Sequence, residues 1–182
     1  LDQQGWASLA SLQGKITQAP LFIDDSPNMT LLEIRAKARR LKQRHHLGLI
    51  VLDYLQLLSS GKKVESRQQE VSEFSRSLKL LAKELEVPVI ALSQLNRGSE
   101  QRTDKRPMIS DLRESGSIEQ DADMVILLHR EDMYNPDSDR VGEADMIIAK
   151  HRGGPTKTIP LAFSGKYSRF NNMASETPPQ QY

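Results

Sequence analysis

The chain contains no cysteine among its 182 residues. This absence excludes disulfide bonds, zinc–thiolate centres and a thiol nucleophile, and it gives no sign of a secreted, disulfide-stapled framework. No apolar run approaches the roughly 20 residues of a membrane span, and the first residues lack the layout of a signal peptide. These features predict a soluble, cytoplasmic protein without membrane contact.

A phosphate-cradling loop of the form Gly-x₄-Gly-Lys-Ser/Thr is also missing. Three Gly-Lys pairs occur, but each lacks both the upstream glycine and a following hydroxyl residue: Gly14-Lys15, Gly61-Lys62 and Gly165-Lys166. The pattern Gly-x-Gly-x-x-Gly does not occur either. The chain by itself therefore has no evident seat for a triphosphate.

Charge and length set further bounds. The net charge is +1, so any contact with nucleic acid must depend on local basic patches and not on a global field. With 37% hydrophobic residues, the length fits one domain with a real core. The chain starts at Leu1 and enters a helical pattern almost at once, which indicates a piece of a longer protein.

Apolar periodicity and turn signals predict an alternation of helices and strands. Helices are expected over residues 5–18, 31–46, 66–86 and 111–120, the last one interrupted at Gly116. Strands are expected over residues 21–23, 49–52, 89–93, 124–128, 144–150 and 156–163. Capping-box patterns at Thr30 and Ser66 mark two of the helix starts. Trp6 is expected to anchor an apolar stripe in the core.

This order predicts an α/β fold, with a mostly parallel sheet flanked by helices and extended by antiparallel strands at one edge. The apolar strands after residues 48, 88 and 123 lack polar alternation, so they are expected to be buried on both faces. Residues 96–109 are predicted to be a long polar loop. Residues 1–170 are expected to form one domain, and residues 171–182 a disordered tail.

Two polar residues end two predicted strands that follow each other in the chain. Asp53 follows the first apolar strand and Gln94 follows the next, with one helix between them. Strands connected in this way are commonly neighbours or one place removed, so both residues should face one crevice at the carboxyl edge of the sheet. A carboxylate there can hold the Mg²⁺ of a nucleotide, and an amide can contact a terminal phosphate. The alternatives are an aspartate that caps a turn and a glutamine satisfied by backbone.

Two cations lie at the end of the strand expected over residues 144–150. Lys150 and Arg152 are two residues apart, so they should point to one side, as a clamp on phosphate would require, while His151 points away. Ordinary surface charges are the alternative for the pair, and packing or surface exposure for His151. Arg113 to Gly116 places a cation and a turn after the basic segment, which suits either single-stranded nucleic acid or a helix cap.

Taken together, these segments resemble the C-terminal, RecA-like motor domain of bacterial replicative DNA helicases of the DnaB family. The resemblance runs from Ala19 to about Phe170 and rests on four ordered motifs: Ile50–Leu57 is similar to the Walker B motif, Pro88–Arg97 to the motif that follows it, Asp111–Asp123 to the next, and Ala149–Thr156 to the arginine-finger strand. It implies a RecA-like P-loop ATPase core that lacks its P-loop segment.

The resemblance also implies roles. Asp53 would coordinate Mg²⁺ with ATP, and Gln94 would sense the γ-phosphate. Lys150 and Arg152 would act in trans on the neighbouring subunit's nucleotide. Arg113, Glu114 and Gly116 would contact single-stranded DNA in the channel of a homo-hexamer, and primase and a helicase loader would be partners.

In the family, the phosphate loop and the catalytic glutamate lie upstream of the matched region, so this chain alone is expected to hydrolyse little or no ATP. Two alternatives stay open. One is a RecA-like recombination or repair ATPase, and the other is a non-enzymatic module for single-stranded DNA binding or assembly.

Overall fold

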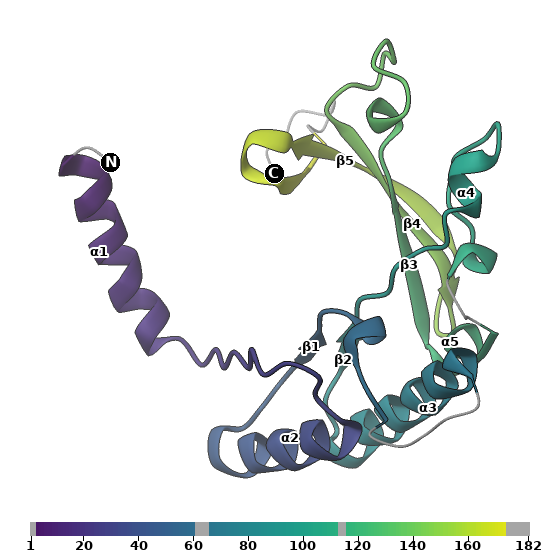
Figure 1. Ribbon diagram of the computed structural model, residues 1–182. Coiled ribbons are helices and arrows are strands. Elements are labelled where there is room, and N and C mark those ends of the chain that lie inside the picture. The colour runs from purple at the N-terminus through teal and green to yellow at the C-terminus, as the bar shows by residue number, and fades with distance from the viewer. Residues whose placement is uncertain (1–2, 61–65, 113–115, 174–182) are drawn as a thin grey trace, which may run out of the picture.

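The computed structural model describes residues 3–60, 66–112 and 116–173, and its fold is of the α/β class (Figure 1). The helices are α1 (Gln3–Gln18), α2 (Leu31–His45), α3 (Arg67–Leu85), α4 (Gly98–Gln101) and α5 (Gly116–Asp121). The strands are β1 (Ile50–Leu52), β2 (Val89–Ala91), β3 (Met124–His129), β4 (Glu143–His151), β5 (Lys157–Ser164) and β6 (Arg169–Asn172).

The strands form two sheets. β1 and β2 pair in parallel, whereas β3, β4, β5 and β6 form an antiparallel meander in chain order. The predicted parallel and antiparallel parts are both present, but they are separate sheets and not one continuous sheet. Within the described residues, β2 and β3 each keep one edge without a partner strand.

Helix α3 lies at the centre of the core. Ser66 caps its start by accepting a hydrogen bond from the Gln69 N–H, as the capping pattern predicts. Its apolar stripe is buried, and Val71 and Phe74 are fully enclosed. One cluster joins this stripe to α2 through Ile34, to α5 through Ile118, and to both sheets. Helix α3 is therefore the layer on which both sheets rest.

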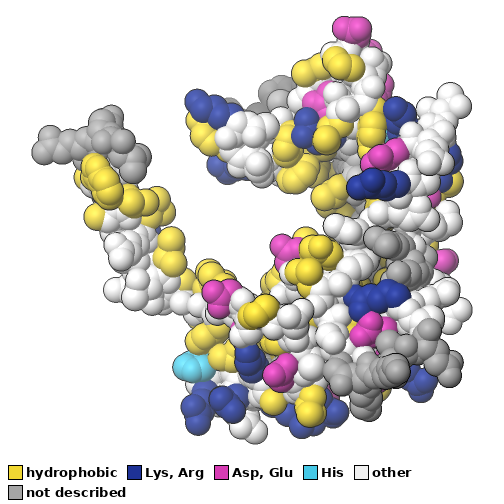
Figure 2. All heavy atoms as spheres, viewed as in Figure 1, with side chains coloured by type: hydrophobic (Ala, Val, Ile, Leu, Met, Phe, Trp, Pro, Cys, Tyr) yellow, Lys and Arg dark blue, Asp and Glu magenta, His cyan; other side chains and the backbone are white. Residues whose placement is uncertain are grey.

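The prediction that the apolar strands are buried on both faces is wrong. In β3, Val125 and Leu127 are buried, but Ile126 and Leu128 on the opposite face are about half exposed. In β1, Val51 is also more than half exposed. The helices cover the face toward α3, and the described elements cover the other face only in part. Figure 2 shows apolar side chains along the side of the body that faces α1.

The N-terminal elements also differ from expectation. Helix α1 forms as predicted, but Trp6 is 60% exposed and therefore is not a core anchor. Residues 21–23 are not a strand, because no described strand lies beside them to complete a hydrogen-bond ladder, and Ile23 is 82% exposed. Figure 1 shows α1 standing away from the body at the end of this extended segment.

The segment 96–109 is more ordered than a loop. It contains α4, and the Arg102 guanidinium donates two hydrogen bonds of 2.7 Å to the buried Asp111 carboxylate. This bidentate pair lowers the pKa of Asp111. Two of the four basic residues of the segment, Arg102 and Arg106, are therefore engaged in structural ion pairs.

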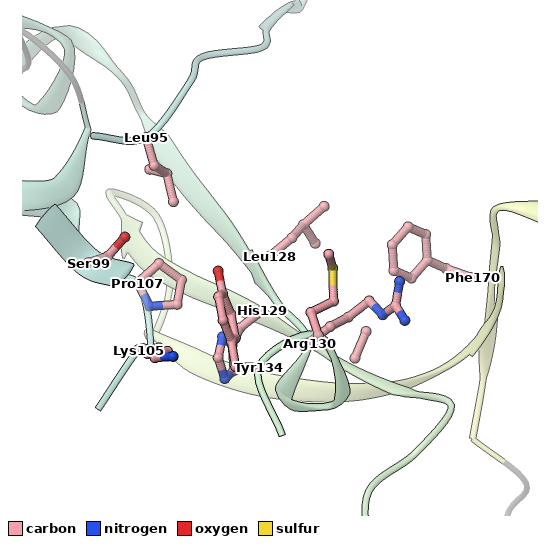
Figure 3. A pocket seen from close by; sticks show the side chains of 11 residues that line it. Leu95, Ser99, Lys105, Pro107, Leu128, His129, Arg130, Tyr134 and Phe170 are labelled. Carbon is pink, nitrogen blue, oxygen red and sulfur yellow. The ribbon is translucent and has the colours of Figure 1, made fainter. Parts of the chain in front are cut away.

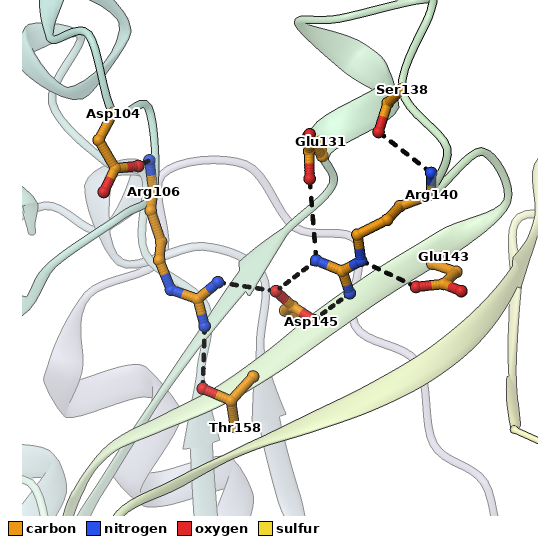
Figure 4. A network of polar contacts seen from close by, with 8 residues as sticks. All are labelled: Asp104, Arg106, Glu131, Ser138, Arg140, Glu143, Asp145 and Thr158. Carbon is orange, nitrogen blue, oxygen red and sulfur yellow. Dashed lines mark hydrogen bonds and ion pairs between the residues drawn. The ribbon is translucent and has the colours of Figure 1, made fainter.

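A second ion-pair network centres on Asp145, which is 4% exposed in the middle of the meander (Figure 4). Its carboxylate accepts hydrogen bonds from Arg140 at 2.7 and 3.2 Å and from Arg106 at 2.8 Å. Arg106 also donates to the Thr158 hydroxyl at 2.9 Å. The network ties the segment after Gln94 to strands β4 and β5.

The C-terminal boundary predicted at residue 170 falls inside β6, which continues to Asn172. The rest of the predicted tail, from residue 174, lies outside the described residues. Within the described part, no helix is long and apolar enough to cross a membrane.

We predict that Asp145→Asn lowers the free energy of unfolding by about 2 kcal/mol at pH 7, because hydrogen bonds from both guanidinium groups lose their charged acceptor. Arg140, followed by Arg106, holds the pKa of Asp145 below its usual range. The stabilisation is therefore present above the ordinary aspartate pKa of about 3.9 and disappears as the pH falls through the lower folded value. Urea unfolding of both proteins across this pH range measures the difference.

Asp139→Asn is the matched control, since Asp139 is exposed. The control should unfold like the parent at every pH. Equal stabilities of the two variants at pH 7 would contradict the role of Asp145.

Candidate functional site: the carboxyl edge of β1 and β2, and the end of β4

Asp53 and Gln94 lie at the same edge of one sheet. Strands β1 and β2 are direct neighbours, with Leu52 opposite Ala91. The ladder continues past the strand ends, because the Leu92 N–H donates to the Leu52 carbonyl and the Leu55 N–H donates to the Leu92 carbonyl, both at 2.9 Å. The sequence predicts strands that are neighbours or one place removed, and the structure shows that they are direct neighbours.

Both side chains are available to an external ligand. Asp53 and Gln94 are exposed, and neither side chain makes a hydrogen bond or ion pair in the described part of the chain. No group of three or more His, Cys, Asp or Glu side chains capable of holding a metal occurs there either. Asp53 and Gln94 thus offer a carboxylate and an amide to a ligand at this edge.

Sequence reasoning missed Gln56, which connects the two strand ends. It lies in the short turn Leu55–Leu57 directly after Asp53. Its Nε2 donates to the Ser93 Oγ at 3.0 Å, and its Oε1 accepts from the Gln94 N–H at 3.3 Å. Arg67 fixes the turn by donating to the Gln56 carbonyl at 2.8 Å. Gln56 stands inside the Walker B-like motif, but strand periodicity could not reveal which neighbour its amide would contact.

The two cations at the end of β4 lie on one side, as strand alternation predicts. Lys150 Nζ donates to the carbonyls of Glu119 and Gln120, the second at 3.3 Å. Arg152 donates to the same Gln120 carbonyl at 2.8 Å. These acceptors belong to the last turn of α5, where helix carbonyls lack intrahelical partners. The pair therefore rests on the C-terminal end of α5.

His151, between the two cations, packs against the turn that follows the strand. A Cβ placed on Gly154 would lie 2.7 Å from its imidazole ring, so only glycine fits there without displacing the ring. This contact supports a packing role for His151.

Asp123 joins this group from the residue before β3. Its carboxylate pairs with Lys79 of α3 and lies 3.5 Å from the Arg152 guanidinium. Its backbone carbonyl accepts the Arg152 N–H at 2.9 Å. The hydrogen bond from Lys79, followed by the charges of Lys79 and Arg152, lowers the pKa of Asp123, so the carboxylate stays ionised. Sequence reasoning gave this residue no separate role.

The predicted DNA-contact residues are only partly visible. Arg113 and Glu114 lie outside the described residues, whereas Gly116 is exposed and is the first residue of α5. Helix α5 therefore has a predicted DNA-contact residue at its start and the Lys150–Arg152 pair at its end. In Figure 1, α5 lies beside α3 and the end of β4, apart from the strand ends of β1 and β2.

A cavity of about 200 Å³ lies elsewhere, between the segment after Gln94 and the ends of β3 and β6 (Figure 3). Leu128, His129, Arg130 and Phe170 line part of it, so its wall is both apolar and cationic. Burial lowers the pKa of His129. None of the site residues predicted from the sequence lines this cavity.

Comparison with known proteins places this geometry in a family. The family model described as the DnaB-like helicase C terminal domain matches residues 1–172. A protein named replicative DNA helicase DnaB from Leifsonia xyli subsp. xyli (strain CTCB07) is 70% identical over 174 residues, which are 96% of this chain and 38% of that protein. A protein of the same name from Geobacillus stearothermophilus is 58% identical over 95% of this chain and 38% of its own length.

Two solved structures agree in fold. One, described as a DnaB-like replicative helicase and its interactions with primase, superposes with a TM-score of 0.89 at 44% identity, over 96% of this chain and 42% of its own. The other, described as an ATPase domain, has a TM-score of 0.88 at 45% identity, over 93% of this chain and 60% of its own. This chain spans well under half the length of the replicative helicases it matches, and it belongs to the family of DnaB-like helicase C-terminal domains.

Proposed function

We propose that this chain is the part of a replicative DNA helicase that couples ATP hydrolysis to movement on single-stranded DNA. The observation that carries the proposal is the placement of Asp53 and Gln94, both exposed, at the carboxyl ends of two hydrogen-bonded parallel strands. Ligands of open α/β sheets bind at this edge. The names of the relatives as replicative helicases support the same function.

Asp53 fits a nucleotide-bound Mg²⁺. Magnesium is commonly held by one or two carboxylates, with phosphate oxygens and water completing its shell. One exposed carboxylate without a competing ion pair meets this need, and no larger acidic cluster is required. The metal, when bound with ATP, would neutralise charge on the phosphates. Asp53 would orient it at the sheet edge.

Gln94 would contact the terminal phosphate, and Gln56 would keep it in place. The Gln56 amide holds the backbone of Gln94 and the side chain of Ser93, so it fixes the distance between the two strand ends. A phosphate sensor must be positioned within a fraction of an ångström to favour the reactive geometry.

Lys150 and Arg152 would act on the nucleotide of an adjacent subunit. They lie at the end of β4 in the antiparallel sheet, whereas Asp53 and Gln94 belong to the parallel sheet. No described contact joins the two groups within one chain. An arginine supplied from a neighbouring chain stabilises the charge that develops on the transferred phosphoryl group. A head-to-tail contact of this kind builds either a closed ring or an open filament. We propose a closed ring, a homo-hexamer.

Single-stranded DNA would contact Arg113, Glu114 and Gly116. Primase and a helicase loader would bind the complete protein. The complete protein would act in the cytoplasm. The solved relative described with its primase interactions supports the primase partner. The recombination or repair ATPase receives no such support, since the relatives named above are replicative helicases. A binding module without nucleotide linkage remains the rival for this chain on its own.

We predict that Asp53→Asn and Arg152→Ala each abolish DNA-stimulated ATP hydrolysis in the longer protein, whose upstream part can be supplied by the Leifsonia relative. Mixing the two inactive variants should restore part of the activity. In a mixed ring, an Asp53→Asn subunit donates Arg152 to a neighbour that retains Asp53, so some interfaces are complete. Steady-state ATPase rates across mixing ratios measure this recovery.

Arg44→Ala is the matched control, because Arg44 is exposed on α2 and makes no ion pair in the described residues. This variant should hydrolyse ATP like the parent. No recovery at any mixing ratio would refute the in-trans role, and an inactive parent would refute the proposed function.

We predict that this chain alone hydrolyses little or no ATP, because it lacks a sequence that can cradle the phosphates. ATPase assays with and without single-stranded DNA test this expectation. Turnover by the chain that Asp53→Ala abolishes would contradict it. DNA binding that weakens steeply with salt, and that ATP does not affect in the longer protein, would favour the binding module.

We predict that Gln56→Leu in the longer protein lowers kcat about tenfold and leaves the KM for ATP nearly unchanged, because a displaced Gln94 impairs the reactive geometry more than binding. The amide proton of Gln94 should also exchange faster with solvent. Gln43→Leu is the control, since Gln43 is exposed on α2. Unchanged exchange at Gln94 together with a parental kcat would show that Gln56 does not position it.

A further inference from the structure

We propose that Asp123 and the end of α5 position the Lys150–Arg152 pair, so that α5 links this pair to the DNA-contact segment at Gly116. The inference rests on the proposed function and deepens it, because it assigns a positioning residue and a physical connection between the two ends of α5. Asp123 touches neither nucleotide nor DNA in this proposal. It acts through Arg152.

The first step is the chemistry of a helix end. The last carbonyls of α5 have no partners within the helix, and they form the negative end of its dipole. Lys150 and Arg152 both donate to this end, and they share the Gln120 carbonyl as acceptor. Two cations, one near the end of β4 and one directly after it, are thus held by one turn of helix, which fixes their separation and direction.

The second step is the bridge made by Asp123. Its backbone carbonyl holds the Arg152 N–H, and its carboxylate lies between the Arg152 guanidinium and Lys79 of α3. The bridge therefore connects Arg152 to α3, the most buried helix of the core. The Asp123 carboxylate and the Gln120 carbonyl contact the Arg152 guanidinium from two positions. The arginine side chain therefore has fewer orientations available than a free surface arginine.

The third step is the connection to Gly116. Helix α5 has six residues, which span about 9 Å. It packs on α3, and Ile118 at its middle is buried in the core. Because so short a helix moves as a unit, a shift of its start at Gly116 also moves the carbonyls at its end. A DNA contact at the start would thereby change the position of the Lys150–Arg152 pair.

Because the Asp123 and Arg152 side chains are exposed, an effect on the position of Arg152 can be distinguished from an effect on the stability of the fold. The side chains of Asp123 and Arg152 are 62% and 54% exposed, and ion pairs on the surface add little to the stability of a fold. Loss of the Asp123 charge should therefore leave the melting temperature close to that of the parent. A change in rate would then report the geometry of Arg152.

The test is Asp123→Asn in the longer protein, where it should lower DNA-stimulated kcat about tenfold. The KM for ATP and the affinity for single-stranded DNA should stay within twofold, and the rate without DNA should fall less than the stimulated rate. Asp123→Glu keeps the charge and should recover most of the rate. Asp121→Asn, a neighbouring acid without an ion pair in the described residues, should match the parent.

A double variant identifies the route of the effect. In an Arg152→Ala background, the slow residual hydrolysis is measured by single-turnover kinetics at high enzyme concentration. This rate should not fall further when Asp123→Asn is added, because the residue acts through Arg152. Independent, multiplicative losses would overturn the inference, as would a parental rate for Asp123→Asn or a lowered melting temperature that explains its loss of activity. If the parent itself lacks DNA-stimulated ATPase activity, the proposed function fails, and this inference fails with it.

Discussion

The buried stripe of α3 is the contact on which the rest of the structure depends. Val71 and Phe74 are fully enclosed, and the cluster around them includes residues of α2, α5 and both sheets. The parallel sheet, which carries Asp53, and the meander, which carries Lys150 and Arg152, are not hydrogen-bonded to each other. Packing on α3 therefore helps to set their relative position, together with the Arg106–Asp145 ion pair that ties the segment after β2 to β4. Close-packed interiors deform little, so this helix can hold two separate chemical groups in a fixed relation.

The faces of β1 and β3 that point away from the core expose apolar side chains. Ile126 and Leu128 of β3 and Val51 of β1 expose apolar surface, and β2 and β3 each have one edge without a partner strand in the described residues. Contiguous apolar surface and open strand edges favour association with another segment. The relatives are more than twice as long as this chain, so further sequence is available in such proteins to cover these faces.

Much of this arrangement could be predicted from local sequence. The capping residues before α2 and α3 mark real helix starts, and the apolar runs before Asp53 and Gln94 are neighbouring strands. The errors arise where structure depends on a distant partner. The run at residues 21–23 has the composition of a strand, but without a neighbouring strand its backbone groups cannot form a ladder. Trp6 likewise has an apolar stripe beside it but stays 60% exposed, because none of the elements that the structure describes covers it.

The candidate site shows the same limit at the level of side chains. Strand alternation correctly places Lys150 and Arg152 on one side, because that geometry is local. It cannot identify their acceptors, which are 30 to 32 residues away in α5. Helix carbonyls are neutral acceptors and bind cations more weakly than phosphate oxygens do. The pair can therefore be held in place on α5 and still be released to a more strongly charged ligand. A carboxylate bound to each cation would hold it more strongly and would oppose its transfer to a ligand. The Asp123 carboxylate contacts both Lys79 and Arg152, so its charge is shared between two cations.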